Sequence, residues 1–178
     1  MKRTIATLAA LAALGSAQAA AAQADRACIT EREISHLAIY AVPAMVEGVR
    51  GKCARSLSAT GFLATRGDAF AAKYASLQAE TWSGAKSAIT KFAAPKVEGE
   101  AAEGFAMVAG LPDEAVRPLV DALIAQKIGE EIEIKDCANI ERAMQLLSPI
   151  GPRDSGALIG FVFSLVKPDD ARLCPAKT

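Results

Sequence analysis

The sequence is poor in the residues that catalytic, metal and nucleic-acid sites usually need. It has one histidine, 5% aromatic residues and no Cys-x-x-Cys pair, and its 20 basic residues never form a run of four. One histidine is too few for the usual zinc ligands, and the missing Cys-x-x-Cys argues against a thioredoxin-type redox pair. Scattered basic residues give no electrostatic footprint for nucleic acid. We therefore expect no metal, no cofactor and no nucleic-acid partner.

The first 24 residues have the pattern of a secretory signal peptide. Met1-Lys2-Arg3 precedes the apolar stretch Ile5–Leu14, and a run of small residues follows. Cleavage after Ala19 is favoured by its distance from the apolar stretch, and cleavage after Ala24 is the alternative. Losing the two basic residues of this leader leaves 18 basic against 20 acidic residues, a net charge of −2. We expect a soluble periplasmic or secreted domain over residues 25–178.

Composition and periodicity predict an all-α fold, a single irregular bundle of five to seven helices. Alanine is abundant, aromatic residues are few, and apolar residues recur at three- and four-residue spacing. Thr30 and Glu33 form a capping box that begins the first helix, which Pro43 should kink or end. The expected helices are 31–48, 56–65, 68–92, 101–109, 112–128, 136–147 and 152–166, with 68–92 the longest and 130–135 an extended connector.

The run Ala157–Val166 is the most apolar stretch after the leader. Ten helical residues rise only about 15 Å, whereas a membrane span needs about 20 apolar residues. We therefore expect no membrane span, and this helix should be buried at the centre of the bundle. Gly156 and Gly160 form a Gly-x-x-x-Gly pair that lets a second helix approach closely. Core packing is the favoured interpretation, and a bound partner helix or ligand tail is the alternative.

An even number of cysteines in an exported chain indicates disulfides. The four are Cys28, Cys53, Cys137 and Cys174. A turn at Pro149–Pro152 would send the last helix back antiparallel to its predecessor and bring Cys174 to Cys137. By exclusion Cys28 would pair with Cys53, although a straight first helix holds them too far apart, so this pairing requires a corner at Pro43.

Three groups of residues could carry catalysis. His36 lies one turn after Glu33, where a carboxylate could orient it as a base, but a surface or boundary histidine is the favoured interpretation. Ser83-Gly84-Ala85-Lys86 matches the Ser-x-x-Lys of penicillin-recognising enzymes, without that family's other motifs. Two acidic clusters lack calcium-loop spacing and are interpreted as solvated faces. They are Glu98, Glu100 and Glu103, and Glu130, Glu131, Glu133 and Asp136. We assign no catalytic residue.

The sequence thus favours a non-enzymatic binding or interaction protein of the cell envelope. Its partner would be an apolar small molecule or an envelope protein, held at a groove edged by Phe70, Trp82 or Met107. The alternative is a small envelope hydrolase that uses His36 or paired carboxylates. A purely structural role ranks third, and the sequence does not indicate an oligomeric state.

Overall fold

The computed structural model describes residues 28–93, 98–168 and 172–175. The expected signal peptide lies outside this part of the chain. The described residues form eight α-helices and one 3-10 turn with no β-strand, so the all-α prediction is confirmed and the expected helix count is exceeded. The elements are α2 (Glu31–Cys53), α3 (Phe62–Thr65), α4 (Gly67–Ala75), α5 (Gln78–Ala93), α6 (Glu100–Ala109), α7 (Asp113–Glu131), η2 (Ile134–Asp136), α8 (Cys137–Leu147) and α9 (Pro152–Val166).

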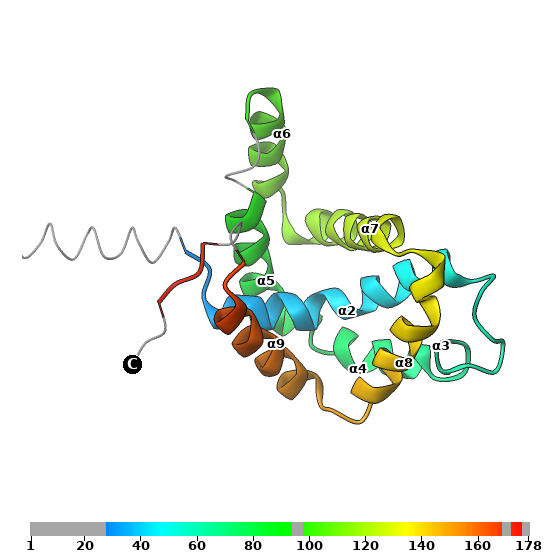
Figure 1. Ribbon diagram of the computed structural model, residues 1–178. Coiled ribbons are helices and arrows are strands. Elements are labelled where there is room, and N and C mark those ends of the chain that lie inside the picture. The colour runs from blue at the N-terminus through cyan, green and yellow to red at the C-terminus, as the bar shows by residue number, and fades with distance from the viewer. Residues whose placement is uncertain (1–27, 94–97, 169–171, 176–178) are drawn as a thin grey trace, which may run out of the picture.

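The central element is α2, not the C-terminal helix. Thr30 and Glu33 form the predicted capping box at its start, and the helix continues through Pro43 to Cys53. Helices α4, α5, α7 and α9 all pack on it (Figure 1). Its buried residues are Ile34, Ile39, Tyr40, Ala41, Ala44, Val46, Gly48, Val49 and Cys53. Because they are distributed around the helix, α2 can be covered on several sides.

The core is distributed along α2 in three clusters. One contains Cys53, Phe70 and Cys137, a second contains Tyr40 and Trp82, and a third surrounds Ile29, Ile34 and Ala88. The expected single helix over 68–92 is wrong, because the chain turns at Ser76 and Leu77 between α4 and α5. This turn sends Phe70 into the first cluster and Trp82 into the second.

Two shorter elements also differ from expectation. The helix expected over 56–65 is reduced to α3, which begins only at Phe62, where the Glu141 carboxylate accepts a hydrogen bond from the Leu63 amide at 2.8 Å. The extended connector expected over 130–135 is taken up partly by the last turn of α7 and partly by η2. Ile128 and Ile132 pack on the first core cluster, and this packing is compatible with helix up to Glu131.

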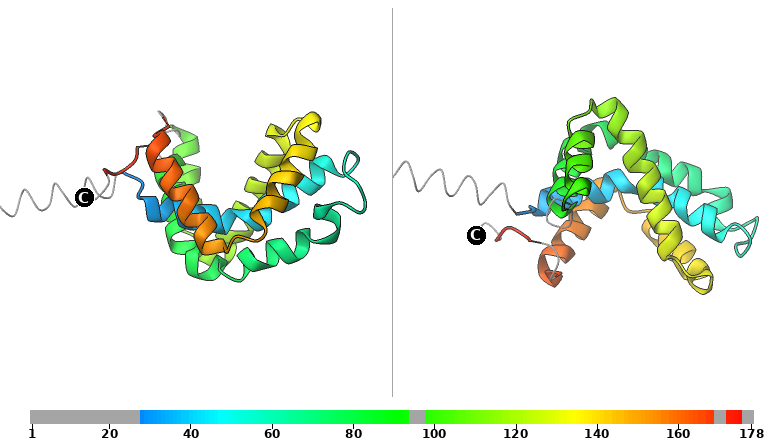
Figure 2. Two further views of the ribbon diagram at one scale, coloured as in Figure 1. Left: turned by 60° about the horizontal axis from the view of Figure 1, so that its bottom comes forward. Right: turned by 90° about the horizontal axis from the view of Figure 1, so that it is seen from above.

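The disulfides are Cys28–Cys174 and Cys53–Cys137, so the predicted pairing is wrong. An uninterrupted α2 separates its ends by about 33 Å, far beyond the reach of a disulfide between Cys28 and Cys53. Helix α9 does not pack antiparallel to α8. It packs on the N-terminal half of α2, and Figure 2 shows α8 and α9 apart from each other. The C-terminal segment then meets Cys28, where the Cys174 amide donates to the Ile29 carbonyl at 3.0 Å.

Candidate functional site

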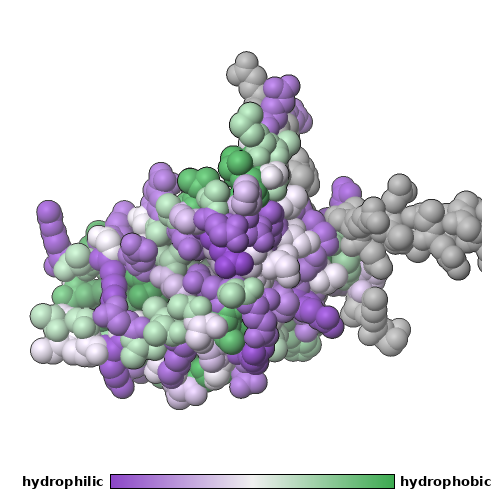
Figure 3. Space-filling model, turned by 180° about the vertical axis from the view of Figure 1, so that it is seen from behind, coloured by the Kyte–Doolittle hydropathy of each residue, from purple (hydrophilic) through white to green (hydrophobic). Residues whose placement is uncertain are grey.

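The three residues expected at the edge of an apolar groove lie in different places. Phe70 is 4% exposed and Trp82 is 2% exposed, and they belong to separate core clusters. Met107 is 73% exposed on α6, a helix that rises from the body of the molecule (Figure 3). The fold therefore does not gather these three side chains into one groove.

Helix α9 packs on α2 through its small residues. Ser155, Gly156 and Gly160 are its buried positions. A Cβ atom at Gly160 would lie 2.7 Å from the Glu31 carbonyl oxygen, and one at Gly156 would lie 2.6 Å from Cγ1 of Ile39. The Gly-x-x-x-Gly pair thus serves close helix packing, as the sequence predicted, and it fixes which face of α9 is turned inward.

The opposite face of α9 carries large apolar side chains that are exposed. Leu158, Phe161, Val162 and Leu165 lie at the i, i+3, i+4 and i+7 positions of one stripe about 100° wide. Ile159 and Val166 lie beside it, and the six side chains are between 42% and 68% exposed. We call these six residues the α9 outer face. The expectation that this helix is buried at the centre is therefore wrong.

A monomeric protein rarely exposes a contiguous apolar patch larger than a few hundred Å², and the largest such patch often has a function. The signal for this face was present in the sequence as the same heptad-like spacing. Periodicity alone could not show that the face of α9 with small residues is turned inward and that the face with large apolar residues is exposed.

A second candidate is a polar cluster where α2, α5 and α7 meet. Four side-chain polar atoms of this cluster are buried: the Tyr40 hydroxyl, Trp82 Nε1, Arg117 Nε and Asp121 Oδ1. The Tyr40 and Trp82 rings lie 5.0 Å apart, and the Arg117 guanidinium carbon lies 5.3 Å from the Trp82 ring centroid. Sequence reasoning did not single out Arg117 or Asp121.

Burial governs the electrostatics of this cluster. It raises the pKa of the Tyr40 phenol well above its ordinary value, and the nearby Asp121 carboxylate adds to the shift. Burial also raises the pKa of Asp121, with a further contribution from Glu47, against the opposing effects of Tyr40 and Arg117. Since Tyr40 is only 1% exposed, the phenol lies inside a helix interface and not in an open cleft.

Glu33 and His36, which the sequence offered for catalysis, make contacts that stabilise the fold. The Glu33 carboxylate accepts hydrogen bonds from Lys91 at 2.7 Å, from Ser87 at 2.5 Å and from the Thr30 amide at 2.8 Å. Burial opposes ionisation of Glu33, but these hydrogen bonds outweigh it and lower its pKa. His36 packs on Gly84, whose missing Cβ would lie 2.2 Å from the imidazole Nδ1. Glu33 is thus committed to the helix start.

The Ser-x-x-Lys pair is likewise committed elsewhere. The Lys86 ammonium donates to Asp113 at 3.0 Å and so joins α5 to the first turn of α7. Ser83 is exposed on α5. In the two acidic clusters, the described side chains are exposed or half-buried. Within the described ranges, no group of three or more possible ligands could hold a metal ion.

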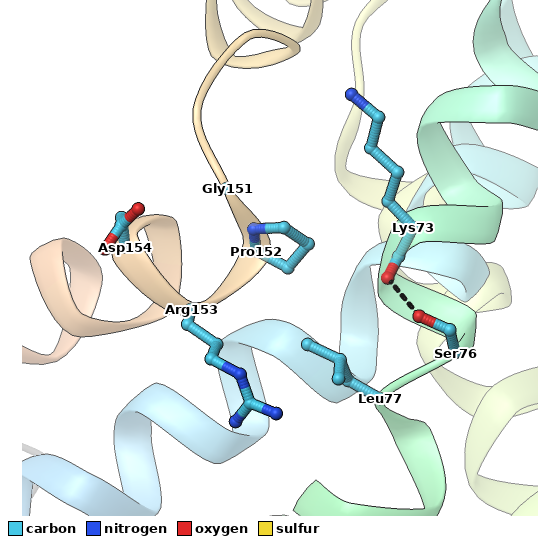
Figure 4. A pocket seen from close by; sticks show the side chains of 7 residues that line it. All are labelled: Lys73, Ser76, Leu77, Gly151, Pro152, Arg153 and Asp154. Atoms are coloured by element: carbon cyan, nitrogen blue, oxygen red, sulfur yellow. Dashed lines mark hydrogen bonds between the residues drawn. The ribbon is translucent and has the colours of Figure 1, made fainter.

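One shallow hollow of about 510 Å³ lies between the end of α4 and the start of α9 (Figure 4). Its two basic side chains are already engaged. Arg153 makes two hydrogen bonds to Glu80 at 2.5 and 2.7 Å, and Lys73 donates to the Ser148 carbonyl at 3.1 Å. In Figure 4, Lys73 extends away from Leu77 and Pro152. The basic groups of the hollow are therefore held by acceptors of the protein itself, and the Asp154 carboxylate is exposed.

Among the described helices, none is both long enough and apolar enough to cross a bilayer. Comparison of the chain with family models, with curated proteins and with solved structures gives no match. Among the described residues, the α9 outer face is the most distinctive surface.

Proposed function

We propose that this protein is an exported, non-enzymatic interaction protein of the cell envelope, and that it binds another polypeptide through the α9 outer face. The signal-peptide pattern of residues 1–24 and the two disulfides support export. The observation that carries the binding role is the exposed stripe of Leu158, Phe161, Val162 and Leu165. An amphipathic helix docks on a partner polypeptide through apolar anchors at this i, i+3, i+4 and i+7 spacing.

The hydrolase alternative, which would use His36 or paired carboxylates, has weaker support. Glu33, the carboxylate that would orient His36, is held by Lys91 and Ser87, and Lys86 of the Ser-x-x-Lys pair is held by Asp113. A hydrolase needs a base within hydrogen-bond reach of a nucleophile or water in an accessible cleft. The contacts of these residues instead hold neighbouring helices together, which is a structural role.

Site-specific photocrosslinking in the native envelope tests the proposal. A photoreactive benzoylphenylalanine replaces Leu165 on the α9 outer face, and the same residue replaces Arg142, which is exposed on α8, as the control. We expect a discrete protein adduct from the position of Leu165 and none from the position of Arg142. Equal labelling at both positions, or no adduct at either in the folded protein, would contradict a docking role for this face.

A further inference from the structure

We propose that the polypeptide bound to the α9 outer face is α9 of a second copy of this chain, in an antiparallel pair related by a two-fold axis. This inference rests on the proposed function and names the partner of that surface. The spacing of the stripe, the opposed helix dipoles and the area available for burial support it.

The stripe is symmetric under reversal of the helix. Leu158, Phe161, Val162 and Leu165 are separated by three, one and three residues, so an antiparallel copy places the same four positions opposite one another. Leu158 then lies opposite Leu165 of the second copy, and Phe161 lies opposite Val162. The two-fold axis repeats the contact between the large Phe161 and the smaller Val162, and this alternation of size favours interdigitation of the two faces.

The dipoles of the two α9 helices are complementary in the same arrangement. In an antiparallel pair, the positive N-terminal end of each helix lies near the negative C-terminal end of the other.

The area is sufficient for a weak dimer. Six half-exposed apolar side chains leave on the order of 500 Å² on each copy, at the upper range for the largest apolar patch of a monomer. A symmetric pair would bury about 1,000 Å² in total, near the lower limit for a specific interface. We therefore expect a dissociation constant in the micromolar range and not a permanent dimer.

Sedimentation velocity of the oxidised, exported protein tests the pairing over a series of concentrations. The unaltered protein should pass from monomer to dimer as its concentration rises through the micromolar range. Phe161→Asp should weaken association by about 100-fold or more, because the two-fold axis introduces the charge into the interface twice. Leu123→Glu, at an exposed apolar position on α7, is the matched control and should leave the dimer unchanged.

A charge pair tests the antiparallel direction. Leu158→Lys alone and Leu165→Glu alone should each weaken the dimer, and the double variant should recover association because each new lysine lies opposite a new glutamate. Within one helix the two positions are two turns apart, too far for a direct ion pair. A parallel pair would place like charges together, so a double variant no better than the single ones would overturn the antiparallel arrangement.

Failure of the pairing can be distinguished from failure of the proposed function. If the unaltered protein stays monomeric, or if Phe161→Asp leaves the dimer intact, α9 self-pairing is wrong. A crosslink from position 165 to a different protein would still support the proposed docking role of this face. Circular dichroism of each variant verifies that the helices are retained, and these exposed substitutions should not disturb them.

Discussion

The packing of α2 against α7 makes a strong prediction about two glycines of the same helix. A Cβ atom added at Gly48 would lie 2.4 Å from the Ala125 carbonyl oxygen and 3.1 Å from Cβ of Ile128. Gly51, three residues later, has no atom within 4 Å of the corresponding position. Both glycines are helical, so Gly48→Ala and Gly51→Ala share the same gain in helix propensity and differ only in their surroundings.

The expected magnitudes follow from these two environments. Alanine in place of helical glycine stabilises by about 0.5–1 kcal/mol, which Gly51→Ala should show in full. At Gly48 the obstructing atom belongs to the backbone of α7, so relief requires movement of a whole helix. Overpacking costs about 1–3 kcal/mol, and a backbone contact belongs at the upper end of that range. Gly48→Ala should therefore destabilise by about 2 kcal/mol net, which places the two variants about 3 kcal/mol apart.

Urea unfolding of the oxidised protein, followed by far-ultraviolet circular dichroism, measures this difference. The slope of the free energy of unfolding against urea should be equal for the two variants, so that the midpoints alone report stability. The midpoint should fall for Gly48→Ala and rise for Gly51→Ala relative to the unaltered protein. If Gly48→Ala proves as stable as Gly51→Ala, the close approach of α2 and α7 described above is wrong.

Three further predictions concern charge and crosslinks. Glu33→Gln should cost about 1–3 kcal/mol at neutral pH by leaving Lys91 half-buried without its partner. Folding lowers the pKa of Glu33, so the ionised carboxylate stabilises the protein above its ordinary pKa of 4.5. This stabilisation is lost as the pH falls through the folded-state pKa, and unfolding measured at several pH values will show the loss. The pKa of Asp121 is raised instead, so its charge opposes folding above that pKa and the penalty is relieved as pH falls towards 3.8. Asp121→Asn should therefore stabilise by less than about 1 kcal/mol at neutral pH, and unchanged or lower stability would contradict this sign. Joint replacement of Cys53 and Cys137 by alanine should lower the free energy of unfolding by about 2–5 kcal/mol, and non-reducing peptide mapping should join these two cysteines to each other in the unaltered protein.

Local signals in the sequence predicted several elements correctly. The capping box of Thr30 and Glu33 satisfies free amides within one turn, so it marks the start of α2 whatever surrounds it. Pro152 fits the first turn of a helix, where its missing amide hydrogen costs nothing, and α9 begins there. Asp113 and Glu114 similarly mark the first turn of α7. These features depend on neighbours in sequence and are therefore readable without a structure.

The α9 outer face could be predicted only in part from the sequence. The spacing of Leu158, Phe161, Val162 and Leu165 was visible, but the helix is apolar on more than one side, so periodicity did not identify the exposed side. The buried neighbourhood of Tyr40 and Asp121 joins residues 81 positions apart. No local pattern reports such a contact.

By itself the sequence determined an all-helical chain, the positions of its main helix starts and the presence of cysteines for two disulfides, because short-range hydrogen bonding and composition govern these properties. Tertiary structure alone decided that α2 is central, that Cys28 pairs with Cys174, and that α9 turns its glycines inward. Each of these outcomes depends on how closely two helix backbones can approach. Gly156 and Gly160 allow α9 to rest directly on α2, and the large side chains of α9 are consequently left facing outward.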